Sequence, residues 1–288
     1  MERWTIRRAI LWTADYLEGK GADSPRSDAD LLLADALGVD RLRLLLDFDK
    51  PLTPDELAAY RKRIERRAAG EPTAYILGRK EFYGRDFLVD ARVLVPRPET
   101  EGLVDRALED LPESARVLDL CAGSGCVGLT IAAERPSARV DLVELEPGAA
   151  EVAAANAARL GVADRCRVLV GDLFAPVEGE PPYDVVVSNP PYVPSGELPG
   201  LSREVRREPH LALDGGGDGL DVVRRIVGGA GRHLVPGGRV ALELSLGQAE
   251  VVVGLLREAG FAKARAEQDF TRRDRYAVGV LAPADDAE

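Results

Sequence analysis

The sequence has few of the residues from which metal sites and disulfide frameworks are built. Its 288 residues include 3 cysteines and 2 histidines, and no two cysteines have the spacing of a zinc or redox pair. Counting alone leaves open a nucleophile formed by a cysteine and a histidine, but no third group that would orient such a pair is evident. We therefore expect no bound metal, and we interpret Cys121, Cys126 and Cys166 as buried structural thiols.

Long hydrophobic runs are also absent. No apolar stretch approaches the roughly 20 residues that a membrane-spanning helix needs. Residues 1–8 alternate charged with apolar side chains, whereas a signal peptide would have a continuous apolar core there. The sequence therefore predicts a cytoplasmic protein without a membrane anchor.

Basic charge is in deficit, because 38 lysines and arginines stand against 49 aspartates and glutamates, for a net charge of −11. An acidic surplus disfavours binding of long nucleic acids through their phosphates and is compatible with a basic protein partner. We interpret the basic run at residues 61–67 as the solvated face of a helix. The expected partner is a protein, and the chain itself is expected to be a monomer.

The length of the chain exceeds what one core usually holds, which predicts a large domain and a smaller one. Residues 1–74 are expected to form the smaller domain, a helical bundle without visible catalytic residues. Its helices are expected at residues 4–17, 27–37, 42–46 and 53–70. Gly38 is expected to stop the second helix, and Thr53 and Pro54 are expected to open the fourth.

A change of pattern after this bundle indicates strands. Residues 75–98 contain two apolar runs on either side of Gly84, followed by Pro96 and Pro98, and predict a β-hairpin linker. In residues 99–288, short apolar runs alternate with helical patterns. This alternation predicts an α/β domain whose doubly wound, mostly parallel sheet is covered on both faces.

The elements of this sheet domain follow from the same pattern. The expected strands are Arg116–Leu120, Arg139–Glu144, Cys166–Val170, Tyr183–Ser188 and Arg239–Leu244. The expected helices are Cys126–Glu134, Pro147–Leu160 and Leu220–Leu234. Two final apolar runs, Phe261–Ala266 and Tyr276–Leu281, have little helical pattern between them and are expected to pair antiparallel.

A glycine-rich turn follows the first of these strands. Gly123, Gly125 and Gly128 have the spacing G-x-G-x-x-G, and glycines allow the backbone to approach a ligand closely. The motif alone is weak, and a tight turn without a ligand is the alternative. The strand before the turn and the helix after it favour a cofactor site.

Acidic residues end the next two strands. Glu144 lies about twenty residues beyond the loop, where a carboxylate accepts hydrogen bonds from both hydroxyls of a ribose. Asp172 follows the third strand and is suited either to the edge of an adenine or to a helix cap or turn. These positions fit a nicotinamide cofactor and S-adenosylmethionine alike. Hydride transfer is disfavoured because no acid/base residue for it is evident after the fourth or fifth strand.

The fourth strand ends in Ser188, followed by the tetrad Asn189–Tyr192 with the sequence Asn-Pro-Pro-Tyr. Ligands bind at the carboxyl ends of strands in such sheets. A proline-rich turn capped by asparagine is the alternative, but it explains poorly why an amide, a rigid diproline and an aromatic ring occur together there. We therefore interpret the tetrad as catalytic.

Methyl transfer to a planar nitrogen requires residues of these types, since the lone pair of that nitrogen is delocalised. The side-chain oxygen of Asn189 and the carbonyl of Pro190 can accept the two N–H bonds of the target and stabilise the positive charge that develops. The prolines fix these acceptors, and the Tyr192 ring can lie on the flat target. A sulfonium is a strong electrophile, so orientation supplies much of the rate and no strong base is needed.

The tetrad and the loop Asp119–Gly125 resemble the amino-methyltransferases of the class I methyltransferase fold. Over nearly its whole length the chain resembles the HemK/PrmC family of release factor glutamine methyltransferases. The further matching segments are Glu71-Pro72, Gly78, Glu81-Phe82, Leu94–Glu101, Glu208-Pro209, Ala212-Leu213, Asp218–Leu220, Leu242–Leu244 and Gln248. Asn-Pro-Pro-Tyr also occurs in DNA adenine methyltransferases, whereas Leu94–Glu101 and the helical N-terminal domain are more specific.

This resemblance implies a Rossmann-like sheet of seven strands that uses S-adenosyl-L-methionine to methylate the glutamine of the Gly-Gly-Gln motif in class 1 peptide-chain release factors. The N-terminal bundle would help to dock the factor. The residues implied in cofactor binding are Asp119, Cys121, Ala122, Gly123, Ser124, Gly125, Glu144, Asp172, Leu173 and Asn189. The residues implied in substrate binding are Asn189, Pro190, Pro191 and Tyr192, of which Asn189, Pro190 and Tyr192 would be catalytic.

Some positions keep two interpretations or depart from the family. Arg97, Glu99 and Thr100 lie in a matching loop, but they are equally suited to begin a helix. The departures are Cys121, where a glycine is usual, Leu173, where an aromatic is frequent, and Ser245, where a glycine is frequent. Residues 215–219 are expected to be a flexible lead into the following helix, because this cofactor has no phosphate to bind.

Three alternatives remain at this point. A DNA adenine methyltransferase would present a flipped base to the same tetrad, although the acidic charge and the absence of a recognisable DNA-reading domain disfavour it. Methylation of a glutamine in a ribosomal protein is a second enzymatic alternative. A non-catalytic binding module is a third, and the intact loop and tetrad disfavour it.

Overall fold

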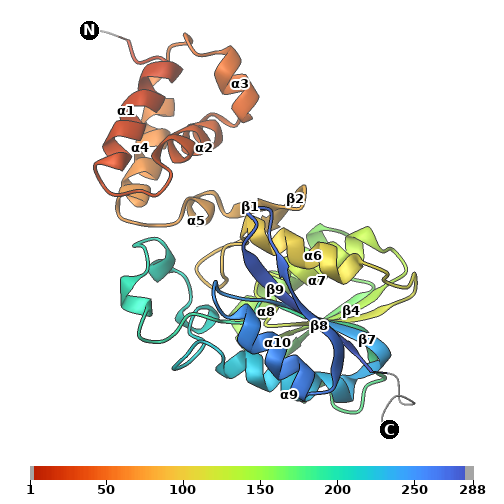
Figure 1. The fold of residues 1–288 in the computed structure, drawn as a ribbon. Coiled ribbons are helices and arrows are strands. Elements are labelled where there is room, and N and C mark those ends of the chain that lie inside the picture. The colour runs from red at the N-terminus through yellow and green to blue at the C-terminus, as the bar shows by residue number, and fades with distance from the viewer. Residues whose placement is uncertain (1–2, 283–288) are drawn as a thin grey trace. The chain divides into compact units, whose positions relative to one another are not determined.

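The computed structural model describes residues 3–282, and the chain divides into two compact units (Figure 1). The first, the helical unit, holds the chain up to Arg79 together with Ser202–Arg207. The second, the sheet unit, holds the remainder. The chain therefore leaves the sheet unit after Leu201 and returns to it at Glu208.

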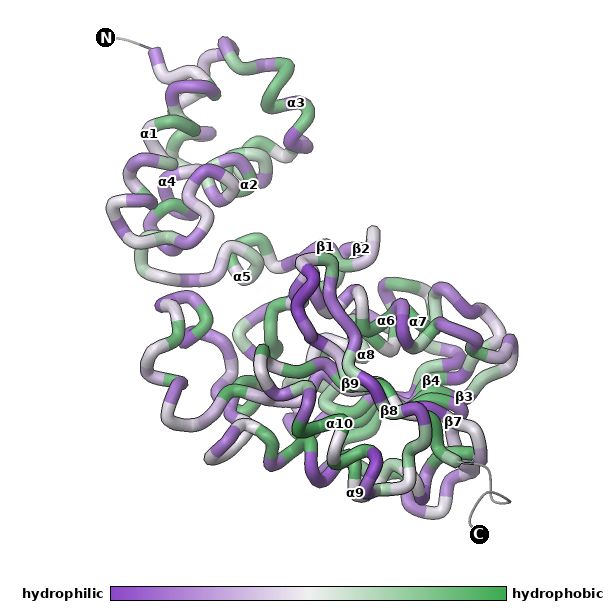
Figure 2. Tube along the Cα trace, viewed as in Figure 1, coloured by the Kyte–Doolittle hydropathy of each residue, from purple (hydrophilic) through white to green (hydrophobic). Residues whose placement is uncertain are grey.

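The helical unit confirms the four predicted N-terminal helices and adds a short fifth. The helices are α1 (Ile6–Glu18), α2 (Pro25–Leu37), α3 (Arg41–Leu46), α4 (Pro54–Ala68) and α5 (Thr73–Leu77). Gly38 ends α2 in the left-handed region, with φ 65°, and Thr53 opens α4 through a reciprocal capping box with Glu56. Hydrophobic and hydrophilic residues lie side by side along these helices in Figure 2, as expected for amphipathic helices around a core.

A buried ion pair lies inside the helical unit. Arg67, on α4, is 2% exposed, and its Nε donates to Asp28 on α2 at 2.7 Å. Thr73 donates to the other oxygen of Asp28 at 2.6 Å, and Glu204, from the returning segment, also pairs with Arg67. Because both charges are out of water, the pair requires these extra partners to be tolerated.

The linker segment, residues 75–98, contains less β-strand than the sequence predicts. Tyr75–Leu77, grouped with the hairpin in the sequence, form most of the helix α5, which ends at Gly78 with φ 70°. The hairpin is confined to β1 (Arg79–Phe82) and β2 (Arg85–Leu88). Phe82 and Phe87 pack edge to face at 5.9 Å and are buried in the core of the sheet unit.

The sheet unit has the predicted seven-stranded, mostly parallel sheet. Its strands are β3 (Arg116–Leu120), β4 (Arg139–Glu144), β5 (Cys166–Val170), β6 (Tyr183–Ser188), β7 (Leu234–Glu243), β8 (Phe261–Gln268) and β9 (Asp274–Leu281). They lie in the order β5-β4-β3-β6-β7-β9-β8. The expected antiparallel pairing of the last two strands is confirmed, and β9 also pairs antiparallel with β7.

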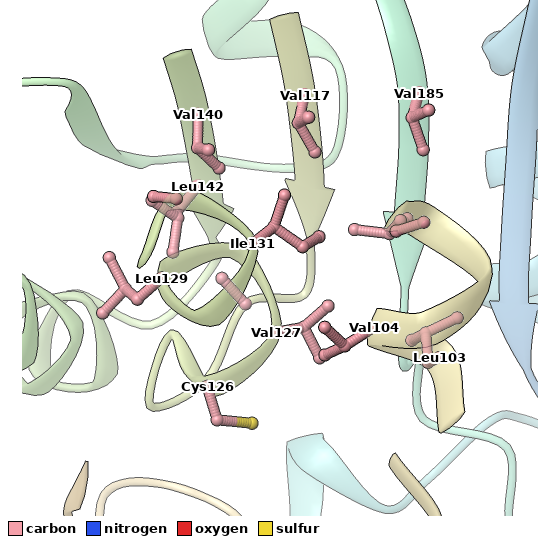
Figure 3. Packing of buried hydrophobic residues seen from close by; sticks show 14 of the residues in the cluster. Leu103, Val104, Val117, Cys126, Val127, Leu129, Ile131, Val140, Leu142 and Val185 are labelled. Atoms are coloured by element: carbon pink, nitrogen blue, oxygen red, sulfur yellow. The ribbon is translucent and has the colours of Figure 1, made fainter. Parts of the chain in front are cut away.

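Helices cover both faces of this sheet, as predicted (Figure 1). They are α6 (Glu101–Leu108), α7 (Cys126–Glu134), α8 (Pro147–Arg159), α9 (Asp221–His233) and α10 (Ala249–Glu258). On one face, strand valines such as Val117 and Val140 pack against Ile131 of α7, and Val104 of α6 packs into the same cluster (Figure 3). On the other face, residues of α9 and α10, including Ile226 and Val252, form a second buried cluster. Burial on both faces explains why the central strands are nearly continuous runs of apolar residues.

Most predicted sheet elements begin and end within two residues of their predicted bounds, and helix α6 was foreseen only through the helix-starting residues before it. Strand β7 begins at Leu234, five residues before the predicted start at Arg239, because the chain pairs with β6 on both sides of an irregularity. Helix α10 has no counterpart among the predicted elements. Its buried positions, Val252, Val253 and Leu256, follow a helical period, so the sequence contained the signal.

No helix in the described part of the chain, residues 3–282, has the length and apolarity needed to span a bilayer. The same residues contain no group of three or more histidine, cysteine or carboxylate side chains placed to hold a metal ion.

Candidate active site

The strand order creates a switch point at the carboxyl ends of β3 and β6. From β3 the chain crosses to β4 on one side, whereas β6 lies on the other side of β3. The loops that follow the two strands therefore diverge, which leaves a crevice where ligands bind in sheets of this kind. Ser188, at the end of β6, donates to the carbonyl of Leu120, at the end of β3, at 2.7 Å, and fixes the two strand ends side by side.

The loop between β3 and α7 turns through three residues with positive φ. These are Cys121 at 58°, Gly123 at 55° and Gly125 at 78°. The left-handed region is open to glycine at little cost and is strained for other residues. Gly125 closes the turn by donating to the carbonyl of Ala122 at 2.8 Å, so that the following helix begins at Cys126.

Asp119 serves the architecture of this loop. Its carboxylate is 1% exposed and accepts the backbone N–H of Gly128, in the first turn of α7, at 2.8 Å. A Cβ on Gly128 would lie 2.9 Å from this carboxylate, so the third glycine of the motif lets the helix approach the strand. Burial raises the pKa of Asp119 to about 7.

Glu144, at the end of β4, also holds the loop. One of its carboxylate oxygens accepts the N–H of Gly123 at 2.8 Å and the other accepts the N–H of Glu146 at 3.0 Å. Each carboxylate oxygen has two lone pairs, so both retain acceptor capacity toward a ligand in the crevice. The geometry fits the predicted contact with ribose hydroxyls.

The two positions after β5 behave differently from each other. Asp172 accepts from Arg225 of α9 at 2.6 Å and is half exposed. Leu173 is buried, and its backbone has a φ of 49°. The structure therefore adds an arginine partner for Asp172 that the sequence did not indicate.

A cavity at the switch point collects most of the predicted site. The predicted residues that line it are Asp119, Cys121, Ala122, Gly123, Ser124, Glu144, Asp172, Leu173, Asn189 and Pro191. Gly125, Pro190 and Tyr192 lie beside these residues in sequence but outside the lining. The cavity also takes in Pro96, Arg97 and Thr100 from the loop whose role the sequence left open.

The side chain of Asn189 is held by Thr100. The amide nitrogen, Nδ2, donates to the Thr100 hydroxyl oxygen at 3.2 Å. Thr100 is the last residue of the short helix η1 (Pro98–Thr100) and stands at the N-cap of α6. Its side chain makes no capping hydrogen bond to α6. Its hydroxyl therefore serves the site, although its neighbours do begin a helix as the alternative interpretation predicts.

Arg97, in the same loop, is fixed by a buried carboxylate. Glu208, which is 6% exposed, accepts from the Arg97 guanidinium and, at 2.9 Å, from the backbone N–H of Val95. These two bonds join the segments Leu94–Glu101 and Glu208-Pro209, which the sequence singled out separately. Arg97 thus lines the cavity in a defined position.

Residues 215–219, which the sequence predicts to be a flexible lead into the following helix, pack against the backbone that follows Asn189. Gly215 donates to the carbonyl of Val193 at 2.9 Å, and Val193 donates to the carbonyl of Leu213 at 2.9 Å. Ser195 donates to the carbonyl of Gly216 at 2.8 Å. A Cβ on Gly219 would lie 2.3 Å from the Tyr192 carbonyl, so glycine is required by close packing. Gly215 and Gly219 therefore let this segment pack closely against the backbone of Pro191 and Tyr192.

One polar residue near the cofactor loop, Asn156, was not singled out from the sequence. Asn156, on α8, is fully buried and donates to the carbonyl of Ser124 in the cofactor loop at 2.9 Å. It also exchanges two hydrogen bonds with Leu88 of β2. A polar residue among alanines in α8 was the available signal. Gln248, matched only through the resemblance, donates to the Tyr192 carbonyl at 3.0 Å.

The three thiols are unsuited to nucleophilic catalysis. Burial raises the pKa of Cys121, Cys126 and Cys166 to about 12 each. The thiolate is the nucleophilic form of cysteine, so these side chains are protonated near neutral pH. The interpretation of the cysteines as structural agrees with this.

Two family models match the chain. One, described as the PrmC N-terminal domain, matches residues 8–78. The other, described as the methyltransferase small domain, matches residues 100–248. Together they cover the helices of the helical unit and the sheet unit from α6 to the end of β7.

Curated relatives are similar over nearly their whole length. A release factor glutamine methyltransferase from Geobacter sulfurreducens is 47% identical over 97% of this chain and 98% of its own. A release factor glutamine methyltransferase from Cereibacter sphaeroides is 45% identical over 96% of this chain and 98% of its own. Among solved structures, a methyltransferase from Pyrococcus furiosus is similar in fold, with a TM-score of 0.52 and 20% identity over 77% of this chain and 98% of that chain.

Proposed function

Because the chain belongs to the release factor glutamine methyltransferase family, we propose that it methylates the side-chain amide nitrogen of glutamine in the Gly-Gly-Gln motif of class 1 peptide-chain release factors, with S-adenosyl-L-methionine as methyl donor. One structural observation carries the chemistry. The Asn189 amide lies in the same cavity as the glycine-rich loop and Glu144. A methyl donor and an amide acceptor can therefore meet there.

The residues present fit S-adenosyl-L-methionine. Glu144 offers acceptor oxygens for ribose hydroxyls, and Leu173 and Ala122 offer apolar surface for a flat base. The Gly123 backbone turns close to the cavity without a side chain in the way. When bound, the cofactor supplies an electrophilic methyl group on a sulfonium. Asp119, Cys121, Ser124, Gly125, Asp172 and Asn189 complete the proposed cofactor site.

The tetrad is proposed to hold the target amide. The Asn189 oxygen, Oδ1, and the Pro190 carbonyl would accept the two N–H bonds of the glutamine, which raises electron density on its nitrogen and stabilises the developing charge. Pro190 and Pro191 are buried and restrict the backbone. The Tyr192 ring would bound the glutamine side chain. The catalytic work of these residues is orientation, since the methyl donor is already activated.

The helical unit is proposed to dock the release factor. It carries exposed apolar side chains at Trp12 on α1 and at Leu42 and Leu46 on α3, and exposed apolar surface marks interaction sites. The net charge of −11 suits a partner with basic surface. We further propose that the enzyme is a cytoplasmic monomer that binds no long nucleic acid.

The test is an acceptor competition with methyl-labelled cofactor. The purified chain is incubated with a class 1 release factor, with the same factor whose Gly-Gly-Gln glutamine is replaced by alanine, with ribosomal proteins, and with duplex DNA. We expect label in the intact factor alone. Label in DNA or in a ribosomal protein, with none in the factor, would show that the substrate assignment is wrong.

A further inference from the structure

The chemistry proposed for Asn189 works in only one orientation of its side-chain amide. The oxygen accepts an N–H from the target, whereas the nitrogen would present two more N–H bonds to it. The two ends of an amide have nearly the same shape, so packing alone does not choose between them. A hydrogen-bonding partner has to set the orientation.

Thr100 is that partner, but a hydroxyl can either donate or accept. With Nδ2 of Asn189 at 3.2 Å, the Thr100 oxygen accepts and its single proton is left for another group. If the Thr100 proton pointed at Asn189 instead, the amide would turn its oxygen toward Thr100 and its nitrogen toward the substrate. The direction of the Thr100 proton therefore decides which end of Asn189 faces the cavity.

Glu243, at the end of β7, lies where it can take that proton. Its side chain is 1% exposed. The hydroxyls of Thr100 and Tyr192 are the side-chain donors beside it, with Tyr192 at 3.4 Å from Oε1. Among the described residues, no partner meets full hydrogen-bond geometry with the buried Oε2. A buried carboxylate with an unsatisfied oxygen is a strong acceptor for the nearby Thr100 proton.

The charges around Glu243 come from several elements. Burial raises its pKa to about 7, Glu99 adds to this increase, and Arg275 of β9 opposes it. Burial also raises the pKa of Tyr192, with the Glu243 charge contributing, so Tyr192 remains a donor. The charge of Glu243 also contributes to the raised pKa of Tyr276 and of Cys126, after burial as the main cause in each case.

We propose that Glu243 is a positioning residue: by accepting the Thr100 proton, it makes Thr100 accept from the Asn189 nitrogen and leaves the Asn189 oxygen facing the substrate amide. This inference rests on the proposed function. It gives Glu243 and Thr100 roles that require neither of them to touch the methyl group. Protonated Glu243 could donate to Thr100, reverse the relay and turn the wrong end of Asn189 toward the substrate.

The first test distinguishes the effect of the Thr100 hydroxyl from the effect of the side-chain volume. Thr100→Val keeps the volume and removes the relay, so we expect kcat for methyl transfer to fall between about 10-fold and 100-fold, as for a misplaced catalytic group. The dissociation constant of S-adenosyl-L-methionine should stay within twofold. Thr100→Ser should restore most of kcat, because the relay needs only the hydroxyl.

Thr130→Val is the matched control, since Thr130 on α7 is fully buried and its hydroxyl has no partner among the described residues. This control should retain the kcat of the wild type. If Thr100→Val also retained it, the hydroxyl would have no part in positioning Asn189 and the relay would be refuted.

The second test measures how kcat depends on pH, because protonation of Glu243 would reverse the hydrogen bonds between Glu243, Thr100 and Asn189. In the wild type, kcat should fall as the pH drops through about 7, where Glu243 becomes protonated. Glu243→Gln cannot titrate and should lose this limb of the profile, with a lower kcat on the alkaline side. Burial raises the pKa of Asp119 to about 7 as well. The acid limb of the kcat profile is therefore assigned to Glu243 only if it disappears in Glu243→Gln.

A measurement without turnover completes this test. A raised carboxyl pKa makes folding less stable as the pH rises from the unfolded value of 4.5 through about 7. Replacing Glu243 by Gln should therefore flatten the dependence of Tm on pH in this window. If Glu243→Gln keeps the fall of kcat at acid pH and the wild-type dependence of Tm on pH, the proposal is overturned.

Failure of this inference can be told apart from failure of the proposed function. The variants are assayed on whichever acceptor the wild type methylates in the competition above. Label in DNA with none in the factor would refute the release factor assignment, while the Thr100 series would still test the relay on the adenine amine, which also has two N–H bonds. Label in the factor, with full kcat in Thr100→Val, would refute the relay alone.

Discussion

At Cys121 the backbone has a φ of 58°, in the left-handed region where a Cβ is strained and glycine is not. The resemblance placed a glycine at this position in most of the family, and the conformation gives the reason. The side chain of Cys121 is partly buried against the core cluster that contains Leu118 and Leu120. Its contacts therefore offset part of the strain.

Replacing Cys121 by glycine should leave stability nearly unchanged. The relief of about 1 kcal/mol of strain is offset by lost contacts and by the backbone entropy of glycine. The control is Cys166→Gly on β5, where the side chain is buried, φ is not positive and no strain is relieved. We expect that control to lose about 2 kcal/mol. Urea unfolding measures both, and equal losses in the two variants would show that the loop is unstrained.

Single residues were predictable where the signal was local. The Asn-Pro-Pro-Tyr tetrad identified Asn189, which follows a strand directly, and the spacing from the glycine loop identified Glu144, which ends one. Thr100 stayed ambiguous, since its partner Asn189 lies 89 residues away. Asn156 was missed for the same reason, because its contacts with Leu88 and Ser124 exist only in the folded chain.

Among the elements, those with strong end signals were predicted well. Thr53 with Pro54 and Glu56 marked the start of α4, and Gly38 marked the end of α2. Segments with apolar runs but weak end signals were not. Tyr75–Leu77 form a helix within a run that also suits a strand. Gly219 is required by its close packing against the Tyr192 carbonyl, which no local pattern encodes.

The ion pair between α4 and α2 predicts a large cost for a single substitution. Arg67→Met would leave Asp28 buried without its cation, and removal of one partner from a buried pair costs about 3–5 kcal/mol. Arg66→Met is the control, because Arg66 and its partner Glu71 are 49% and 33% exposed, and exposed pairs contribute about 1 kcal/mol or less.

Equilibrium urea unfolding of the full chain, followed by the fluorescence of Trp4 and Trp12 in the helical unit, compares the two variants. Both tryptophans lie at α1, so this signal reports on the unit that contains the pair. Equal destabilisation by Arg66→Met and Arg67→Met would show that burial of the Arg67 pair has no energetic consequence.

At the scale of the whole molecule, the family and the fold predicted from motifs are confirmed. The curated relatives match over nearly the full chain, and the sheet has the expected seven strands, mostly parallel, with helices on both faces. The division of the chain between units was harder to foresee. The segment Ser202–Arg207 follows the tetrad in sequence yet belongs to the helical unit, where Arg207 donates to the carbonyl of Ala69 at 3.0 Å.

The central claim is that Asn189 holds the acceptor amide against the methyl donor. Its most direct test is Asn189→Ala, assayed by single-turnover methyl transfer to release factor and by calorimetric binding of S-adenosyl-L-methionine. Loss of the acceptor oxygen should slow transfer by about 100-fold or more, while cofactor binding changes by less than threefold. Transfer at the wild-type rate in this variant would contradict the mechanism.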